Sequence, residues 1–86
     1  MDINELIAII KKKIESKVVI ENIVIEDKSF LHKNHKGNQK DKFHIKIHLK
    51  SRELNQMNKI NANKKIYSIL ENEMNLFIHS IQILIQ

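Results

Sequence analysis

The chain has 86 residues, enough for one small domain, with no cysteine, no proline, a single glycine and a formal net charge of +5. A domain of this size does not enclose a large active site, and without cysteine it can form neither a disulfide nor a thiolate metal site of its own. The longest apolar run, from Leu6 to Ile10, is too short to cross a bilayer, so we expect a cytoplasmic protein that does not insert into membranes.

The N-terminal segment has the pattern of an amphipathic helix. Asp2 fits an N-cap, and Glu5, three residues later, fits the second position of a capping box. The apolar residues that follow recur at helical spacing, and they are Ile3, Leu6, Ile7, Ile10 and Ile14. This pattern predicts a helix from Ile3 to about Ser16.

A strand and a long loop are expected next. Val18 to Asp27 is rich in β-branched residues, and a break near Glu21 and Asn22 leaves the sequence IVIE as the clearest part of the strand. Lys28 to Asp41 is polar and has no apolar periodicity, which predicts a loop of unusual length.

The segment after the loop alternates strictly between apolar and polar residues. The apolar set is Phe43, Ile45, Ile47 and Leu49, and the polar set is His44, Lys46, His48 and Lys50. A period of two predicts a half-buried strand. Its outer face would be cationic, with both histidines in solvent.

The C-terminal part predicts a second helix and a last strand. Ser51 to Lys59 is polar and irregular, with room for one short helical turn, and a helix is expected from about Asn61 to Asn75. The residues that follow helical spacing are Ile60, Lys64, Tyr67, Leu70, Met74 and Phe77, all but Lys64 being apolar or aromatic. Ile78 to Ile85 is mostly apolar on both sides, which favours a central or covered strand.

The predicted order is therefore helix, strand, strand, helix, strand. The economical arrangement is an α+β fold in which a three-stranded mixed sheet carries both helices on one face. We expect residues 1–86 to form a single domain.

Positive charge is concentrated in one stretch of the chain. Lys28 to Lys50 contains seven lysines and one aspartate, a sum of +6, whereas the rest of the chain sums to −1. Four of the five histidines also fall in this stretch, namely His32, His35, His44 and His48. We therefore expect a partner to meet this part of the chain.

Sequence motifs relate the loop and the last strand to a known family. The loop sequence EDKSFLHKNHKG is similar to the D-x-S-x-x-H loop of the BolA-like proteins, and Asp27, Ser29 and His32 occupy the matched positions. His35 and Gly37 match a second histidine and a glycine that many members have. The strand sequence FIHSIQI resembles the I-H-A-L-A-I strand of the family.

The segments between these motifs also follow the family, with departures. FHIKI resembles the second strand, although Lys42 stands where a histidine is usual, and the pattern S-x-x-F-x-G-x-x-x-V-x-R-H-R-x-V-Y aligns without a gap from Ser51 to Tyr67. The departures from that pattern are Gln56 at its glycine and Ala62, Asn63 and Lys64 at its Arg-His-Arg core. Five segments match in order, and together they cover nearly the whole chain.

The resemblance implies a fold similar to class II KH domains, together with a partner and a metal cofactor. Members of the family pair with monothiol glutaredoxins and share a two-iron two-sulfur cluster, to which the BolA-like side contributes histidine. The matching ligands here are His79 and, by spacing, either His32 or His35. Since imidazole suits iron, the chemistry is consistent with this role. The chain alone is expected to be a monomer without the cluster.

Each histidine also has an interpretation without function. His32 and His35 fit solvent-exposed histidines of a polar loop, and His79 fits a half-buried side chain that bonds a backbone carbonyl. The alternative function is nucleic-acid binding, because some BolA-like proteins regulate transcription. The surface for DNA or for docking would comprise Lys33, Lys36, Lys40, Lys46, Lys50 and Lys64.

An enzymatic function is not expected. The sequence shows no nucleophile with a paired base, no phosphate loop and no pair of carboxylates in a credible pocket. Asp27 and Ser29, close to His32, are better explained as residues that shape the turn through bonds between side chain and backbone.

Overall fold

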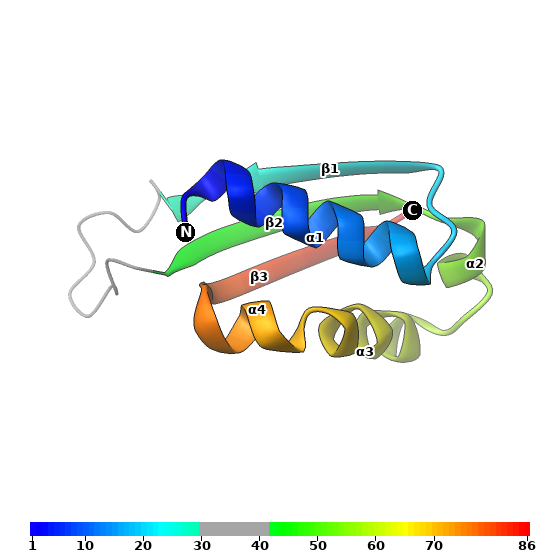
Figure 1. Ribbon diagram of the computed structural model, residues 1–86. Coiled ribbons are helices and arrows are strands. Elements are labelled where there is room, and N and C mark those ends of the chain that lie inside the picture. Colours follow the sequence, from blue (N-terminus) through cyan, green and yellow to red (C-terminus); the bar gives the residue numbers. More distant parts are fainter. Residues whose placement is uncertain (30–41) are drawn as a thin grey trace.

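A computed structural model describes residues 1–29 and 42–86 of the chain (Figure 1). Its elements, in order, are α1 (Ile3–Lys17), β1 (Asn22–Asp27), β2 (Phe43–Lys50), α2 (Arg52–Asn55), α3 (Lys59–Ile69), α4 (Glu71–Leu76) and β3 (Ile78–Ile85). Within this part of the chain no helix is long and apolar enough to span a membrane.

The three strands form one mixed sheet in the order β1-β2-β3. β1 pairs antiparallel with β2, and β2 pairs parallel with β3. Figure 1 shows α1, α3 and α4 on the same face of this sheet. The predicted α+β fold with a mixed sheet and helices on one face is therefore confirmed. The expectation of a central or covered last strand is wrong, because β2 is central and β3 lies at an edge.

α1 begins with the N-cap contact that its sequence predicts. The Asp2 carboxylate accepts a hydrogen bond from the backbone N–H of Glu5 at 2.8 Å, which satisfies one of the free donors of the first turn. The helix buries Leu6, Ile10 and Ile14 against the sheet. These positions are four residues apart and lie on one face of the helix.

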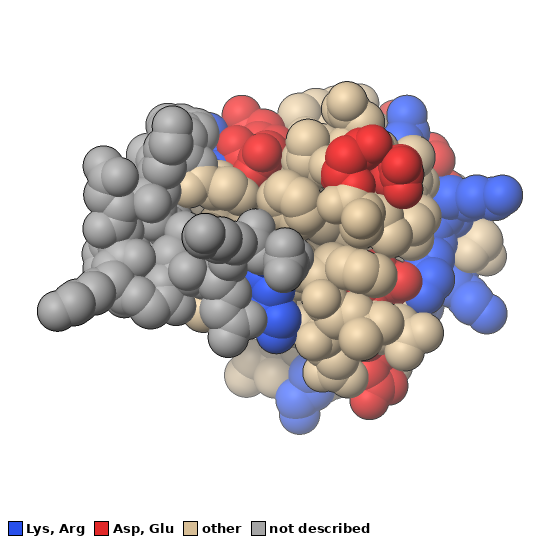
Figure 2. All heavy atoms as spheres, turned by 60° about the vertical axis from the view of Figure 1, so that its left-hand side comes forward, with Lys and Arg blue, Asp and Glu red and all other residues tan. Residues whose placement is uncertain are grey.

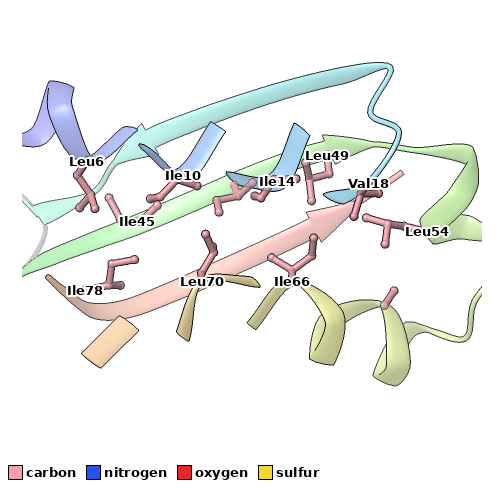
Figure 3. Close-up of a cluster of buried hydrophobic side chains, with 12 residues drawn as sticks. Leu6, Ile10, Ile14, Val18, Ile45, Leu49, Leu54, Ile66, Leu70 and Ile78 are labelled. Carbon is pink, nitrogen blue, oxygen red and sulfur yellow. The ribbon is translucent and has the colours of Figure 1, made fainter. Parts of the chain in front are cut away.

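The hydrophobic core lies between the helices and the sheet (Figure 3). Its buried members are Leu6, Ile10, Ile14, Val18, Ile45, Ile47, Leu49, Leu54, Ala62, Ile66, Leu70 and Ile78. The alternation predicted for β2 is confirmed on this side, because Ile45, Ile47 and Leu49 are all buried. Since every element apart from β1 and α4 contributes a fully buried apolar side chain, folding of the sheet and of the helices is coupled.

The predicted second helix differs from the structure in its length and in its buried face. It is divided at Leu70, where φ is −99° and ψ is 15°, into α3 and α4. α3 turns Ala62 and Ile66 to the core, whereas Ile60 is 70% exposed. The predicted face is therefore wrong at Ile60 and Tyr67, in whose place Ala62 and Ile66 are buried. It is right at Leu70, which is buried, and at Met74 and Phe77, which pack against the core.

An ion pair joins the first and the last helices. Lys13 Nζ lies 2.8 Å from Glu73 Oε2 and 3.0 Å from Glu73 Oε1. The Glu73 side chain is only 7% exposed. A nearly buried carboxylate needs such a partner, so this pair fixes α4 against α1.

Candidate functional site

The candidate site lies at the end of the sheet where β3 begins. The strands β2 and β3 pair Phe43 with Ile78 and then His44 with Ser80, so that His79 is an extra residue on β3. Such a bulge turns side chains away from the regular alternation and is typical of functional sites. One consequence is that Ile78 faces the core, as do Ile81 and the residues that alternate with it.

His79 is exposed at this bulge. The expectation that it shares a half-buried face with the isoleucines of β3 is therefore wrong. Among residues 1–29 and 42–86, the structure gives its imidazole a ring contact with His44 and no hydrogen bond. The imidazole of His79 can thus present a ring nitrogen to a metal without first breaking a bond to another described residue.

His44 is the residue at this end of the sheet whose surroundings the sequence pattern predicted wrongly. Its position on the outer face of β2 predicts a solvated side chain, yet it is only 5% exposed. Its Nδ1 lies 2.6 Å from the hydroxyl of Ser80, and its ring centroid lies 4.9 Å from that of His79, with 59° between the ring planes. Alternation within one strand cannot reveal this contact, because it depends on the register between two strands that are distant in sequence.

A short turn at residues 27–29, directly after β1, is hydrogen-bonded to the backbone of His44. The Asp27 carboxylate accepts a hydrogen bond from the N–H of Ser29 at 2.9 Å, and the Ser29 hydroxyl accepts one from the N–H of His44 at 3.1 Å. The N–H of Lys28 donates to the carbonyl of His44 at 2.7 Å. The expectation that Asp27 and Ser29 shape a turn is therefore confirmed.

The predicted loop ligands His32 and His35, together with Lys33, Lys36 and Lys40, lie outside the described residues. The residues on either side of that segment are placed. Ser29 bonds the backbone of His44, and the N–H of Phe43, which follows Lys42, donates to the carbonyl of Phe77 at 2.9 Å. The chain therefore leaves and re-enters the described structure at the end of the sheet that carries His79.

The described part of the chain does not contain a complete metal site. It has no group of three histidine, cysteine, aspartate or glutamate side chains that could hold a metal ion. His44 and His79 are the histidines that it brings together. A metal at this place would need ligands from the segment 30–41, from a partner protein, or from both.

The cationic face predicted on the sheet carries acidic groups as well. On the face away from the helices, His48 Nε2 donates to Glu26 at 3.0 Å and Lys28 Nζ lies 3.6 Å from the same carboxylate. The hydrogen bond from His48, followed by the charge of Lys28, lowers the pKa of Glu26 below its ordinary value. The carboxylate therefore offsets part of the positive charge that Lys46 places beside it, as its cross-strand neighbour.

The remaining predicted lysines do not share one surface. Lys46 and Lys50 lie on β2, on the face without helices, whereas Lys64 is exposed on α3, which covers the opposite face. Figure 2 shows both acidic and basic side chains on the described surface that it displays. The six lysines predicted as one surface therefore include members that face opposite ways.

A hollow elsewhere in the molecule contains neither a carboxylate nor a histidine. It has a volume of about 330 Å³ and lies between the end of β3 and the turn from α2 to α3. Its lining is Leu54, Asn55, Met57, Lys59, Ala62, Asn63, Ile83, Leu84, Ile85 and Gln86. Lys59 is the one ionisable side chain in this lining, which contains neither a carboxylate nor a histidine to pair with it.

Comparisons with known proteins agree with the geometry of the fold. A family model for "BolA-like protein" matches residues 14–86. BolA1 from Arabidopsis thaliana superposes with a TM-score of 0.78 at 24% identity, covering 92% of this chain and 87% of that chain. The BolA domain of SufE1 from Arabidopsis thaliana gives 0.77 at 20% identity, covering 100% of this chain and 93% of that chain. A bol-like protein from Babesia bovis gives 0.70 at 13% identity, covering 91% and 79%. No match was found among curated protein sequences.

Proposed function

The chain belongs to the BolA-like protein family, and from this premise we propose that it is a non-enzymatic adaptor that pairs with a monothiol glutaredoxin. The two proteins would share a two-iron two-sulfur cluster. This chain would contribute His79 and one histidine of the loop, His32 or His35. The adaptor would act in the delivery of iron-sulfur clusters or in iron regulation.

The observation that carries the proposal is the state of His79. Its ring is exposed, it stands on a bulge of an edge strand, and it has no hydrogen bond to another described residue. A histidine must present a neutral ring nitrogen to bind a metal, and a ring in this state can do so.

The placement of the loop ends supports the choice of a second ligand from the loop. Ser29 is bonded to His44, and the ring of His44 contacts that of His79. His32 follows Ser29 by three residues, a span of at most about 11 Å in extended chain. The loop that carries His32 and His35 therefore begins at a residue bonded to His44, which itself contacts His79, and this is why we propose the loop as the source of the second ligand.

The residues available fit a cluster that is completed by another protein. The chain has no cysteine, and its described part has no cluster of three ligands. Thiolates would have to come from the partner. A cluster that is held partly by histidine carries less negative charge and has a higher reduction potential than one held by thiolates alone.

The adaptor role agrees with the other described features. The hollow lined by Leu54, Met57 and Ile83 contains no pair of acid and base side chains, and we propose no catalytic activity. We further propose that the free protein is a cytoplasmic monomer.

Visible circular dichroism of the complex tests the proposal. Addition of this protein to a cluster-loaded monothiol glutaredoxin should change the spectrum, because ligands of the iron are exchanged. The variant His79→Ala should lose this change, whereas His48→Ala, which alters a histidine of the neighbouring strand, should retain it. A spectrum that the wild-type protein leaves unaltered would refute the shared cluster.

Nucleic-acid binding ranks second, and the described surface weakens the case for it. Glu26 lies between His48 and Lys28 on the sheet face that would meet phosphates, and Lys64 lies on the other side. Binding to duplex DNA, measured at several salt concentrations, should therefore be weak and should show no preference for sequence beyond the electrostatic slope. A clear sequence preference at physiological salt would reverse this ranking.

A further inference from the structure

We infer that His44 is a positioning residue, which holds the imidazole of His79 in the orientation needed for metal ligation. The inference rests on the proposed function of His79 as a ligand. It concerns a residue on a different strand, which the pattern of the sequence placed in solvent and the structure buries.

The contact between the two rings has the geometry of a favourable aromatic pair. The centroids are 4.9 Å apart and the planes are inclined by 59°. Pairs of aromatic rings prefer separations of about 4.5–7 Å and tilted or offset arrangements over face-to-face stacking. His44 thus contacts one side of the His79 ring, which is otherwise exposed.

His44 can restrict the ring of His79 because its own ring is fixed. Its Nδ1 lies 2.6 Å from the hydroxyl of Ser80, the residue directly after His79, and the side chain is almost completely buried. The ring of His44 is therefore held by β3 at one residue and contacts the neighbouring residue of the same strand.

The backbone of His44 is fixed from the opposite side. Its N–H donates to the Ser29 hydroxyl, and its carbonyl accepts from the N–H of Lys28. His44 is thus bonded to the residues that precede the loop and to the strand that carries His79. A single residue links the two parts of the chain from which the proposed ligands come.

A fixed neighbour matters for a ligand on an exposed bulge. An exposed side chain exchanges between rotamers, and a metal site needs its ligands within about 0.5 Å of the productive geometry. Groups that orient a metal-bound histidine usually do so by a hydrogen bond to its second nitrogen, and their loss lowers metal affinity about 10- to 100-fold. Here the described orienting contact is the tilted ring of His44.

Three variants of His44 separate its ring from its polar group. His44→Phe keeps a ring but cannot bond Ser80, His44→Asn keeps a polar group but loses the ring, and His44→Ala loses both. His48→Ala is the matched control, since His48 lies on the same strand and the same face and contacts Glu26 instead. His44→Phe also protects the test against a general loss of folding, because it refills the buried space.

The first measurement does not depend on the cluster. Three-bond NMR couplings report the χ1 distribution of His79 in the free protein. We expect one dominant rotamer in the wild type, in His48→Ala and in His44→Phe, and averaged couplings in His44→Ala and His44→Asn. Couplings of His79 that are identical in all five proteins would overturn the inference.

The second measurement uses the complex with a cluster-loaded monothiol glutaredoxin. We expect His44→Ala to weaken formation of the shared cluster about tenfold and to shift its visible dichroism bands, with recovery in His44→Phe. Unchanged affinity and bands in a folded His44→Ala would also overturn the inference. If the wild-type protein itself leaves the spectrum unaltered, the proposed function fails, while the couplings still decide whether His44 orients His79.

Discussion

Two regions of the molecule, the helix-bearing side of the sheet and the end of the sheet where β3 begins, are held together by different interactions. On the side that carries the helices, apolar side chains at regular spacing pack into one core, and burial alone decides which residues belong there. At the end where β3 begins, a bulge, a turn and a pair of histidine rings decide the arrangement. Periodicity therefore explains α1 and the inner face of β2 in the first region, and contacts between distant segments explain the second.

The largest expected effect separates the core from the surface of the same helix. Ile66 is fully buried and Ile60 is 70% exposed, although both are isoleucines of α3. We expect Ile66→Ala to lower the free energy of unfolding by about 2–5 kcal/mol, because it leaves a cavity. Ile60→Ala should change it by less than about 0.5 kcal/mol.

Urea denaturation measures both values. Equal losses in the two variants would mean that α3 does not present Ala62 and Ile66 to the sheet. The assignment of the core face would then return to the one predicted from the sequence.

The second effect concerns the ion pair that joins α4 to α1. Glu73→Gln should lower the free energy of unfolding by about 1–3 kcal/mol, because the charged hydrogen bonds of Lys13 to a nearly buried carboxylate are lost. Glu71→Gln, two residues away on the exposed side of α4, serves as the control. A loss of equal size in the control would show that helix charge, and not this pair, is responsible.

The contrast between the two regions also explains how much of the fold the sequence could predict. The spacing of Leu6, Ile10 and Ile14 and the alternation of β2 depend on local geometry, so α1 and the inner face of β2 were predictable. The position of β3 at an edge was not, because isoleucines on one face and Leu84 on the other resemble the pattern of a covered strand.

The buried face of α3 was also difficult to predict. Ile60 and Tyr67 are larger and more apolar than Ala62, so spacing and hydrophobicity favoured the wrong stripe. A small residue fits where the helix and the sheet approach closely. A single sequence does not show where that approach occurs.

The candidate site was predictable in part. The role of His79 came from the family resemblance, whereas the turn was predicted from the side chains of Asp27 and Ser29 and is confirmed by its hydrogen bonds. The contact of His44 with His79 depends on the parallel register of β2 and β3 and on the bulge between them. Neither is encoded in the spacing within one segment.

A smaller effect tests the opposite face of the sheet through its pH dependence. The folded protein lowers the pKa of Glu26 below 4.5, chiefly through the hydrogen bond from His48. A carboxylate with a lowered pKa stabilises the fold above its ordinary pKa, and this contribution is lost as the pH falls through the folded value. At pH 6 the wild type should therefore have a higher unfolding temperature than Glu26→Gln.

This difference in unfolding temperature should become smaller as the pH falls below 4.5. Glu15→Gln, which removes an exposed carboxylate of α1, serves as the control. A difference for Glu26→Gln that stays constant throughout acid titration would mean that His48 and Lys28 do not hold the Glu26 carboxylate in solution.

The most direct test of the central claim detects the ligands themselves. The protein is prepared with ¹⁵N-labelled histidine, combined with an unlabelled cluster-loaded monothiol glutaredoxin and reduced, and pulsed electron paramagnetic resonance then records hyperfine couplings of ¹⁵N to the cluster. We predict strongly coupled ¹⁵N from this chain, one component of which disappears in His79→Ala and persists in His48→Ala. A cluster signal without strong ¹⁵N coupling, or with couplings that His79→Ala leaves intact, would contradict the account.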